Sequence, residues 1–430
     1  MAVQHLLHHV EIGVRHGLSA VKRLVNGFNF RTIAKRDADL VQQWLLQAGS
    51  TKFLITQLKN SGEDDFSIPS QLHTKDKYTA NWNDYLVDKR LVTRNELIDS
   101  VFNVALEVKD VERCVKRVSQ QGAQVLRPPS RFADTNGHVT YATVRSCVGN
   151  VIHTLINSQN YKGVFLPEFV PVNSEPTSVI TTKPLFDHVD HITLACHKGS
   201  SLDIIKWYED AFGMKRFFLN SEEDTEGGFV VQTKNIGMRL FAMNYWKCSE
   251  MGLEMPPVEN TSESLKLTIA EALPGDGPNQ VETFLQEHLG AGIQHIGLHT
   301  DSILDTVHQF YLNGVEFLNP PPTYYTKLGK LSEISLVGEN AKLLQQRGVL
   351  LDAEADAGNT SSSVDEYRYL MQVFTKTLFD RNTFFLELIQ RNGASGFGAG
   401  NISALWTAVD AYFQSQEQNH QHSAIKHSGT

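Results

Sequence analysis

The sequence has few cysteines, no long apolar run and no excess of basic residues, and each absence removes a class of protein. Its four cysteines include no closely spaced pair, which argues against a disulfide framework or a thiolate metal cage. No apolar run approaches the ~20 residues of a membrane-spanning helix. A formal net charge of -9 without basic runs argues against a nucleic-acid partner. We therefore expect a protein that acts on a small molecule and does not span a membrane.

The chain of 430 residues is longer than one hydrophobic core usually supports, and it contains an internal repeat. Four segments each combine a strand-like run, a helix-like run that ends at a glycine, and further strand-like runs. The lead residues of these units are His9, Asn103, His191 and His295. A recurrence every ~90 to 100 residues predicts βαβββ modules, which pair to curve a sheet around a central cavity. The sequence thus predicts an α+β fold of four modules in two domains.

Prolines with neighbouring Ser and Thr residues mark a linker between the second and third modules, at Pro167, Pro171 and Pro176. We expect one domain at residues 1–175 and a second at residues 180–402. The other predicted segments are a polar loop at 60–95, a flexible insertion at 352–366, a C-terminal helix at 403–414 and a disordered tail at 415–430.

One carboxylate and two histidines of the second domain predict a metal centre. Glu387 lies in the nearly continuous apolar run Phe384–Arg391, which is typical of a buried strand, where a carboxylate needs a cation. A surface glutamate on a half-buried strand is the other interpretation. His191 and His295 share the lead position of consecutive modules, and the final strand of the fourth module carries Glu387. Two imidazoles and a carboxylate on converging strands form a facial triad, which suits Fe(II) and leaves coordination positions open.

Other histidines compete for this role. His188 lies close to His191, but the repeat register aligns His191 with His9 and so argues against His188. His288 and His299 fall outside the register, and we expect them to face solvent.

The first domain offers an internal comparison. Its equivalent positions are His9, Asn103 and either His153 or its neighbour, so an amide replaces the second ligand and the carboxylate is absent. We expect this domain to be non-catalytic and to serve structure or a homodimer.

Several separated motifs resemble those of the 4-hydroxyphenylpyruvate dioxygenase family. In order, these are Ile293–Leu298, Pro320–Tyr325, Met371–Lys376, Phe385–Arg391 and Gly396–Asn401. The resemblance covers most of the chain and is strongest from 290 to 402. It implies the vicinal oxygen chelate fold and an Fe(II)-dependent oxygenase that uses O2 and an aryl α-keto acid. A glyoxalase or an extradiol ring-cleaving enzyme would share the modules, but the motifs around Gln372 and 396–401 argue against both.

The resemblance also implies roles for individual residues. The Fe(II) ligands would be His191, His295 and Glu387. The substrate would be oriented by the amides of Gln280, Gln294 and Gln372, and its ring would be enclosed by Phe374, Phe385 and Phe397. The helix after Asn401 would close over the site as a gate.

Four residues depart from the family pattern. Leu240, Ala270, Ala272 and Ile402 stand where Ser, Asn, Pro and Phe are usual. The loss of polar groups and of one ring should move the substrate ring. These departures resemble the dioxygenase-like branch, which is associated with 4-hydroxymandelate, mitochondria and the ubiquinone head group. The alternatives are a dioxygenase of tyrosine catabolism that forms homogentisate, and a pseudoenzyme that only binds a metabolite.

The N-terminal composition bears on location. Residues 1–36 hold six Lys and Arg residues but one acid, Glu11, a bias seen in mitochondrial transit segments. Structured sequence from His9 leaves little room for a cleavable leader. We expect a mitochondrial protein, with the cytoplasm as the alternative.

Overall fold

The structure is a computed structural model. The residues that it describes are 7–38, 41–59, 92–93, 96–172, 184–217, 223–224, 227–232, 237–245, 265–274, 279–326, 329–354, 367–405 and 407–408. Most of the predicted loop at 60–95, residues 355–366 of the predicted insertion and the whole predicted tail at 415–430 lie outside these residues.

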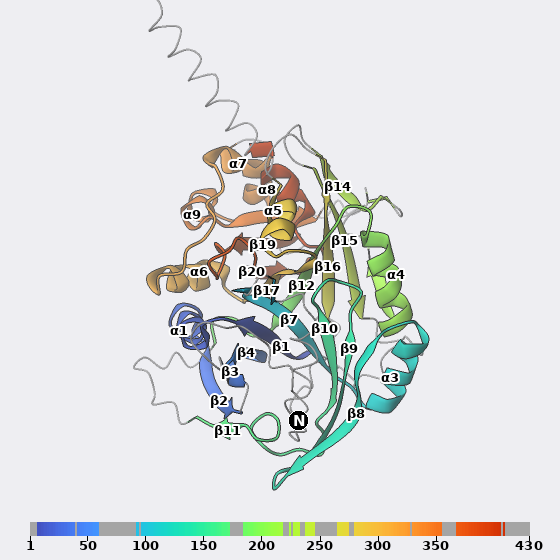
Figure 1. The fold of residues 1–430 in the computed structure, drawn as a ribbon. Coiled ribbons are helices and arrows are strands. Elements are labelled where there is room, and N and C mark those ends of the chain that lie inside the picture. The colour runs from blue at the N-terminus through green and yellow to red at the C-terminus, as the bar shows by residue number, and fades with distance from the viewer. Residues whose placement is uncertain are drawn as a thin grey trace, which may run out of the picture.

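The first half of the chain forms one mixed sheet of two βαβββ modules (Figure 1). Its strand order is β11-β2-β3-β4-β1-β7-β10-β9-β8. The first module comprises β1 (Leu7–Val14), α1 (Gly17–Phe28), β2 (Arg31–Asp37), β3 (Val41–Ala48) and β4 (Thr51–Leu58). The second comprises β7 (Ser100–Glu107), α3 (Val111–Gln120), β8 (Val125–Asp134), β9 (Gly137–Arg145) and β10 (Ile152–Asn157). Outside the modules lie the short strands β5 (Val92–Thr93), β6 (Glu96–Leu97) and β11 (Val170–Pro171).

The second half repeats this arrangement, with strand order β13-β15-β16-β12-β17-β20-β19-β18 and β14 paired to β15. Its third module comprises β12 (Val189–Cys196), α4 (Ser201–Phe212), β13 (Met214–Phe217), β14 (Phe229–Gln232), β15 (Gly237–Tyr245) and β16 (Lys266–Leu273). The fourth comprises β17 (Gly292–His299), α6 (Ile303–Leu312), β18 (Leu350–Glu354), β19 (Arg368–Phe374) and β20 (Phe385–Asn392). The remaining helices are α5 (Gln280–Glu287), α7 (Pro322–Thr326), α8 (Lys330–Leu336) and α9 (Ala341–Arg347). The predicted α+β fold of paired modules is confirmed.

Helix α1 shows how the apolar pattern directs packing. Its buried residues include Ala20, Val21, Leu24 and Phe28, which share one helical face and join the main hydrophobic core. The helix passes through Gly27, where the sequence predicted its end, and stops before Asn29. Asn29 takes the left-handed conformation (φ 59°) and its N–H bonds the carbonyl of Leu24. Asparagine tolerates this conformation, which is why it can replace a terminal glycine.

The C-terminal segment also starts differently from the prediction. A helix begins at residue 399, before the predicted start at 403, and its described part ends at residue 408. The Asp352 carboxylate accepts the Gly400 N–H at 3.0 Å, which satisfies a free donor of the first helical turn. Asp352 itself lies in strand β18, so the predicted insertion at 352–366 starts no earlier than residue 355.

The two halves contact each other at several points. Helices α3 and α4 lie side by side (Figure 1), and the Arg117 guanidinium donates to the carbonyls of Asp210 and Ala211 at 3.2 and 3.3 Å. The Ser50 N–H donates to the Asp187 carbonyl at 2.6 Å. Among the described helices, none has the length and apolar character needed to cross a membrane.

Candidate metal centre

Three neighbouring strands bring the predicted ligands together. His191 lies on β12, His295 on β17 and Glu387 on β20, and β17 pairs with both of the other strands. Gly297 is opposite both His191 and Glu387 in these pairings. A Cβ atom at Gly297 would lie 2.3 Å from Cε1 of His191, so only glycine leaves room for the imidazole.

The ligand atoms converge at distances that suit one ion. Oε2 of Glu387 is 3.2 Å from Nε2 of His191 and 3.4 Å from Nε2 of His295. An octahedral ion with bonds of about 2.1–2.2 Å would hold adjacent ligand atoms about 3 Å apart. His191 and Glu387 are 2% exposed, and His295 is half-buried. The three residues therefore fit a single Fe(II) ion.

The protonation of the cluster follows from its contacts. Burial would lower the pKa of His191, but the nearby carboxylates of Glu387 and Asp190 outweigh it and raise that pKa. Burial would raise the pKa of Glu387, but the two imidazoles lower it. At His295 burial dominates and lowers the pKa. The Glu387 carboxylate is thus ionised beside a neutral His295, as a metal ion requires, and the raised pKa of His191 means that a metal ion would compete with a proton for Nε2.

A buried ion pair orients His191. Oδ1 of Asp190 is 2.9 Å from Nδ1 of His191, and Arg391 bonds both oxygens of Asp190. Burial would raise the pKa of Asp190, but Arg391 holds it well below its usual range. A carboxylate on Nδ1 keeps the proton there and leaves Nε2 free to bind a metal. Asp190 and Arg391 were not predicted from the sequence, although each is in the same strand as a predicted ligand.

A chain of amides supports Glu387. Gln372 donates from Nε2 to Oε1 of Glu387 at 3.4 Å, and its own Oε1 accepts from Nδ2 of Asn401 at 3.1 Å. Asn401 in turn accepts from the Tyr324 hydroxyl at 2.6 Å. Gly398 permits this arrangement, because a Cβ there would lie 1.6 Å from Oε1 of Gln372. The role of Tyr324 was not predicted, although its motif was part of the resemblance.

Aromatic rings surround the histidines. The Phe385 ring is stacked on His295 with centroids 4.7 Å apart, and Phe374 meets the same imidazole edge-on at 6.3 Å. Phe397 contacts His191 edge-on at 4.9 Å. The three phenylalanines predicted to enclose a substrate ring therefore lie beside the candidate ligands.

Of the two other glutamines that were predicted to orient the substrate, Gln294 lies at the cluster and Gln280 does not. Gln294 is 4% exposed, and its Oε1 is 3.3 Å from Nδ1 of His295, so it contacts a ligand directly. Gln280 is exposed at the first residue of α5, and the structure does not bring it to the cluster. The preceding Asn279 is the buried residue here, because its side chain caps the helix by accepting from Val281 N at 2.9 Å.

Comparisons with known proteins agree with this geometry. A family model described as the Glyoxalase/Bleomycin resistance protein/Dioxygenase superfamily matches residues 189–331. The human 4-hydroxyphenylpyruvate dioxygenase-like protein is 34% identical over 405 residues, 93% of this chain and 95% of the human chain. The 4-hydroxyphenylpyruvate dioxygenase of Dictyostelium discoideum is 34% identical over 316 residues, 73% of this chain and 77% of that one. The chain belongs to the 4-hydroxyphenylpyruvate dioxygenase family.

A solved structure supports the same fold. A mutant of 4-hydroxymandelate synthase from Streptomyces coelicolor aligns with a TM-score of 0.68 at 23% identity, over 96% of this chain and 99% of that one. The predicted family and the vicinal oxygen chelate fold are thereby confirmed, as is the prediction of a dioxygenase that acts on an aryl α-keto acid.

The departures from the 4-hydroxyphenylpyruvate dioxygenase pattern gather in one place. Leu240, Ala270 and Ala272 belong to one apolar cluster, which also contains Phe397, and Ile402 packs against it. Leu240 is paired with Ala270 across β15 and β16. Because Phe397 also contacts His191, these substitutions form a continuous apolar surface that reaches the candidate metal centre.

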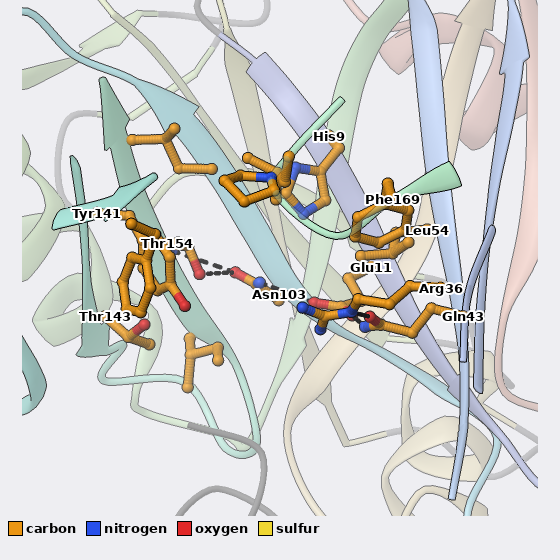
Figure 2. Close-up of a pocket in the computed structure, with 15 residues that line it drawn as sticks. His9, Glu11, Arg36, Gln43, Leu54, Asn103, Tyr141, Thr143, Thr154 and Phe169 are labelled. Atoms are coloured by element: carbon orange, nitrogen blue, oxygen red, sulfur yellow. Dashed lines mark hydrogen bonds between the residues drawn. The ribbon is translucent and has the colours of Figure 1, made fainter. Parts of the chain in front are cut away.

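The first domain contains a degenerate version of the centre (Figure 2). Ile152 pairs with Asn103 as Phe385 pairs with His295, so Thr154 takes the place of Glu387. His153, the other candidate, instead places Nε2 2.9 Å from the Tyr208 hydroxyl. The Thr154 hydroxyl donates to Oδ1 of Asn103 at 3.1 Å, so neutral groups occupy this position.

A carboxylate enters this cavity from another strand. Glu11 accepts from Asn103 and Gln43 at 3.0 Å each and from Thr56 at 2.6 Å, and burial raises its pKa to about 7. The cavity of about 70 Å³ is far below the ~300–1,000 Å³ of typical ligand pockets. The first domain therefore holds a carboxylate, Glu11, that the repeat register did not predict. The hydrogen-bonded side chains of Asn103 and Thr154 stand where the second domain has the ligands His295 and Glu387.

Two further histidines differ from the prediction. His288 is 5% exposed, because it lies between the halves with Nε2 2.7 Å from the Ser100 hydroxyl, and burial lowers its pKa to about 4. The prediction that it faces solvent is wrong. His299 is half-buried beside Asp187, with their Nδ1 and Oδ1 atoms 2.9 Å apart.

Proposed function

We propose that this chain uses Fe(II) and O2 to convert 4-hydroxyphenylpyruvate into 4-hydroxymandelate. The observation that carries the proposal is the juxtaposition of His191, His295 and Glu387 with an apolar surface that includes Leu240 and Ala270. The triad supports a keto-acid-dependent oxygenase, and the apolar surface supports a product other than homogentisate.

Each residue of the centre has a defined task in this reaction. Fe(II) bound by the triad would supply open positions for the keto acid and O2. Asp190 holds the proton of His191 on Nδ1, so that Nε2 is a ligand. Gln372 fixes the Glu387 carboxylate, and Phe385 holds the ring plane of His295 by stacking. The phenylalanines exclude water from the substrate ring.

The reaction balances with one molecule of O2. The bond between the keto and carboxylate carbons breaks and CO2 leaves. One oxygen atom enters the new arylacetate carboxylate, and the other enters a C–H bond of the same molecule. Insertion at the benzylic carbon gives 4-hydroxymandelate. Attack on the ring carbon that bears the side chain, with migration of the side chain to the neighbouring carbon and loss of the proton there, gives homogentisate instead. The product therefore depends on where the ring is held.

Leu240, Ala270 and Ile402 support the benzylic outcome by their effect on substrate position. Leu240 and Ala270 offer no hydrogen bond where the family usually has Ser and Asn, and Ile402 replaces a ring. A substrate with fewer polar contacts at one end and a looser fit at the other shifts relative to the metal, and a shift of about 1 Å is enough to change reactivity. The retained Gln372, Asn401 and phenylalanines favour the homogentisate-forming dioxygenase as the second candidate.

The biological setting is part of the proposal. The resemblance to the dioxygenase-like branch and the basic bias of residues 1–36 support a mitochondrial protein whose product feeds the ubiquinone head group. We propose a homodimer through the first domain, which light scattering can test.

Product chromatography tests the proposal. Protein reconstituted anaerobically with Fe(II) receives 4-hydroxyphenylpyruvate and then O2, with Glu387→Ala as the control without an iron ligand. We expect 4-hydroxymandelate with wild type and neither product with the control. Homogentisate as the main product would support the second candidate, and stoichiometric iron without turnover of any aryl pyruvate would indicate a binding protein.

A further inference from the structure

A second cluster of metal-binding side chains lies where the two sheets meet. Asp187 and His188 immediately precede β12, and His299 is the last residue of β17. The antiparallel pairing continues beyond the strands, because Asp187 N–H donates to the His299 carbonyl at 3.0 Å and His299 N–H to the His188 carbonyl at 2.9 Å. These backbone bonds hold the three side chains next to one another.

The side chains converge on one oxygen atom. Oδ1 of Asp187 is 2.9 Å from Nδ1 of His299 and 3.1 Å from Nδ1 of His188. The two imidazoles are stacked, with centroids 4.6 Å apart and an angle of 17° between their planes. We propose that Asp187, His188 and His299 form a second metal site, which binds Zn²⁺ or a similar divalent ion separately from the iron centre.

A tetrahedral ion fits this site once one imidazole turns. Zinc bonds of about 2.0–2.1 Å separate tetrahedral ligand atoms by about 3.3 Å, which is close to the spacing between Asp187 and each histidine. Because an ion lies in the plane of each ligand ring, one imidazole must rotate out of the stacked arrangement so that both nitrogens face the ion. Two imidazoles and a carboxylate are a ligand set that suits zinc. The histidine side chains are 15% and 18% exposed and that of Asp187 is 50% exposed, so water can reach the fourth position.

The site is distinct from the predicted iron centre. His299 is four residues beyond His295 on the same strand, which corresponds to about 13 Å at 3.3 Å per residue. A single ion cannot bridge that distance, so occupancy of one site does not require the other.

An ion at this site would affect the contact between the two sheets. The Asp187 carbonyl accepts from the Ser50 N–H at 2.6 Å and from its hydroxyl at 3.0 Å. Gly49 packs so closely that a Cβ there would lie 2.3 Å from the same carbonyl oxygen. An ion on the Asp187 side chain would therefore stiffen the contact between the β3–β4 turn of the first sheet and the start of the second. Because it would bind only folded protein, it would raise the melting temperature.

Zinc titration tests the proposal. The full-length His191→Ala/Glu387→Ala variant, which lacks the iron ligands, is titrated with Zn²⁺ and with Co²⁺, whose absorption reports a tetrahedral site. We expect one equivalent to bind, and we expect His188→Ala or His299→Ala in that background to weaken binding at least about tenfold. His197→Ala is the matched control, because this exposed histidine lies outside the cluster and should not change binding.

A second experiment keeps the iron centre intact. In iron-loaded wild type, Zn²⁺ should raise the melting temperature, and the increase should disappear in His299→Ala but not in His197→Ala. Circular dichroism without zinc establishes that each variant folds. The proposal would be overturned if folded His188→Ala and His299→Ala bound zinc as tightly as their parent protein, or if no zinc bound outside the iron centre. The three residues would then form a hydrogen-bonded cluster only.

Discussion

Arg391 binds Asp190 through two parallel hydrogen bonds of 2.7 Å, from Nε to Oδ2 and from Nη2 to Oδ1. Both residues are almost fully enclosed, with 11% and 1% of their side chains exposed. The pair links the strand of Glu387 to the strand of His191. Such bidentate pairs fix geometry more firmly than single hydrogen bonds do. The final strand therefore supplies one candidate ligand and, through Asp190, orients another.

Asp190→Asn should weaken iron binding. The amide cannot offer Nδ1 of His191 a charged acceptor, and loss of such a partner typically costs about 10–100-fold in metal affinity. Anaerobic Fe(II) titration measures the change, and Asp305→Asn on the exposed start of α6 is the control. Unchanged affinity in folded Asp190→Asn would show that the carboxylate does not orient the ligand.

Tyr324→Phe and Tyr325→Phe should differ in their free energy of unfolding, although the tyrosines are adjacent and both almost fully buried. The Tyr324 hydroxyl donates to Asn401, whereas the Tyr325 hydroxyl has no hydrogen-bond partner among the described residues. Loss of the first should lower the free energy of unfolding by about 0.5–1.5 kcal/mol. Loss of the second should be neutral or stabilising. Urea denaturation of the two variants measures both effects, and equal destabilisation would contradict the assignment.

The repeat made much of this arrangement predictable from sequence. His191 and His295 share a lead position in consecutive modules, and Glu387 lies in an apolar run, so local patterns identify all three. The partnership of Asp190 and Arg391 spans 201 residues and depends on strand order, which no local pattern encodes. The burial of His288 likewise depends on how the halves pack, and the exposure of Gln280 depends on where α5 starts.

Glu11 should make stability depend on pH. Its pKa is about 7 in the folded protein, because burial opposes the charge, against 4.5 ordinarily. The folded state therefore binds more protons than the unfolded state between these values. The free energy of unfolding should fall as pH rises from about 4.5 to about 7, by up to about 3 kcal/mol. Denaturation of wild type and Glu11→Gln across this range measures the effect, and parallel pH profiles would contradict it.

Restoring the usual polar groups should shift the product. Leu240→Ser/Ala270→Asn places polar groups on two strand positions that face each other in the apolar cluster. We expect the share of homogentisate to rise relative to 4-hydroxymandelate. Val230→Ser on the adjacent strand β14 is an exposed control and should leave the ratio unchanged. Chromatography of both products measures the ratio. An unchanged ratio in an active double variant would show that this apolar surface does not determine the product.

The iron content of two matched variants tests the central claim most directly. Glu387 and Glu11 are both buried carboxylates, 2% and 1% exposed, and Glu11 reaches the corresponding centre of the first domain from a different strand. Wild type and Glu11→Gln, reconstituted anaerobically and desalted, should each retain one Fe(II) per chain. Glu387→Gln keeps the side-chain size but removes the charge, and it should retain only background iron while it remains folded. Full iron retention by folded Glu387→Gln would contradict the assignment of His191, His295 and Glu387 as the metal centre.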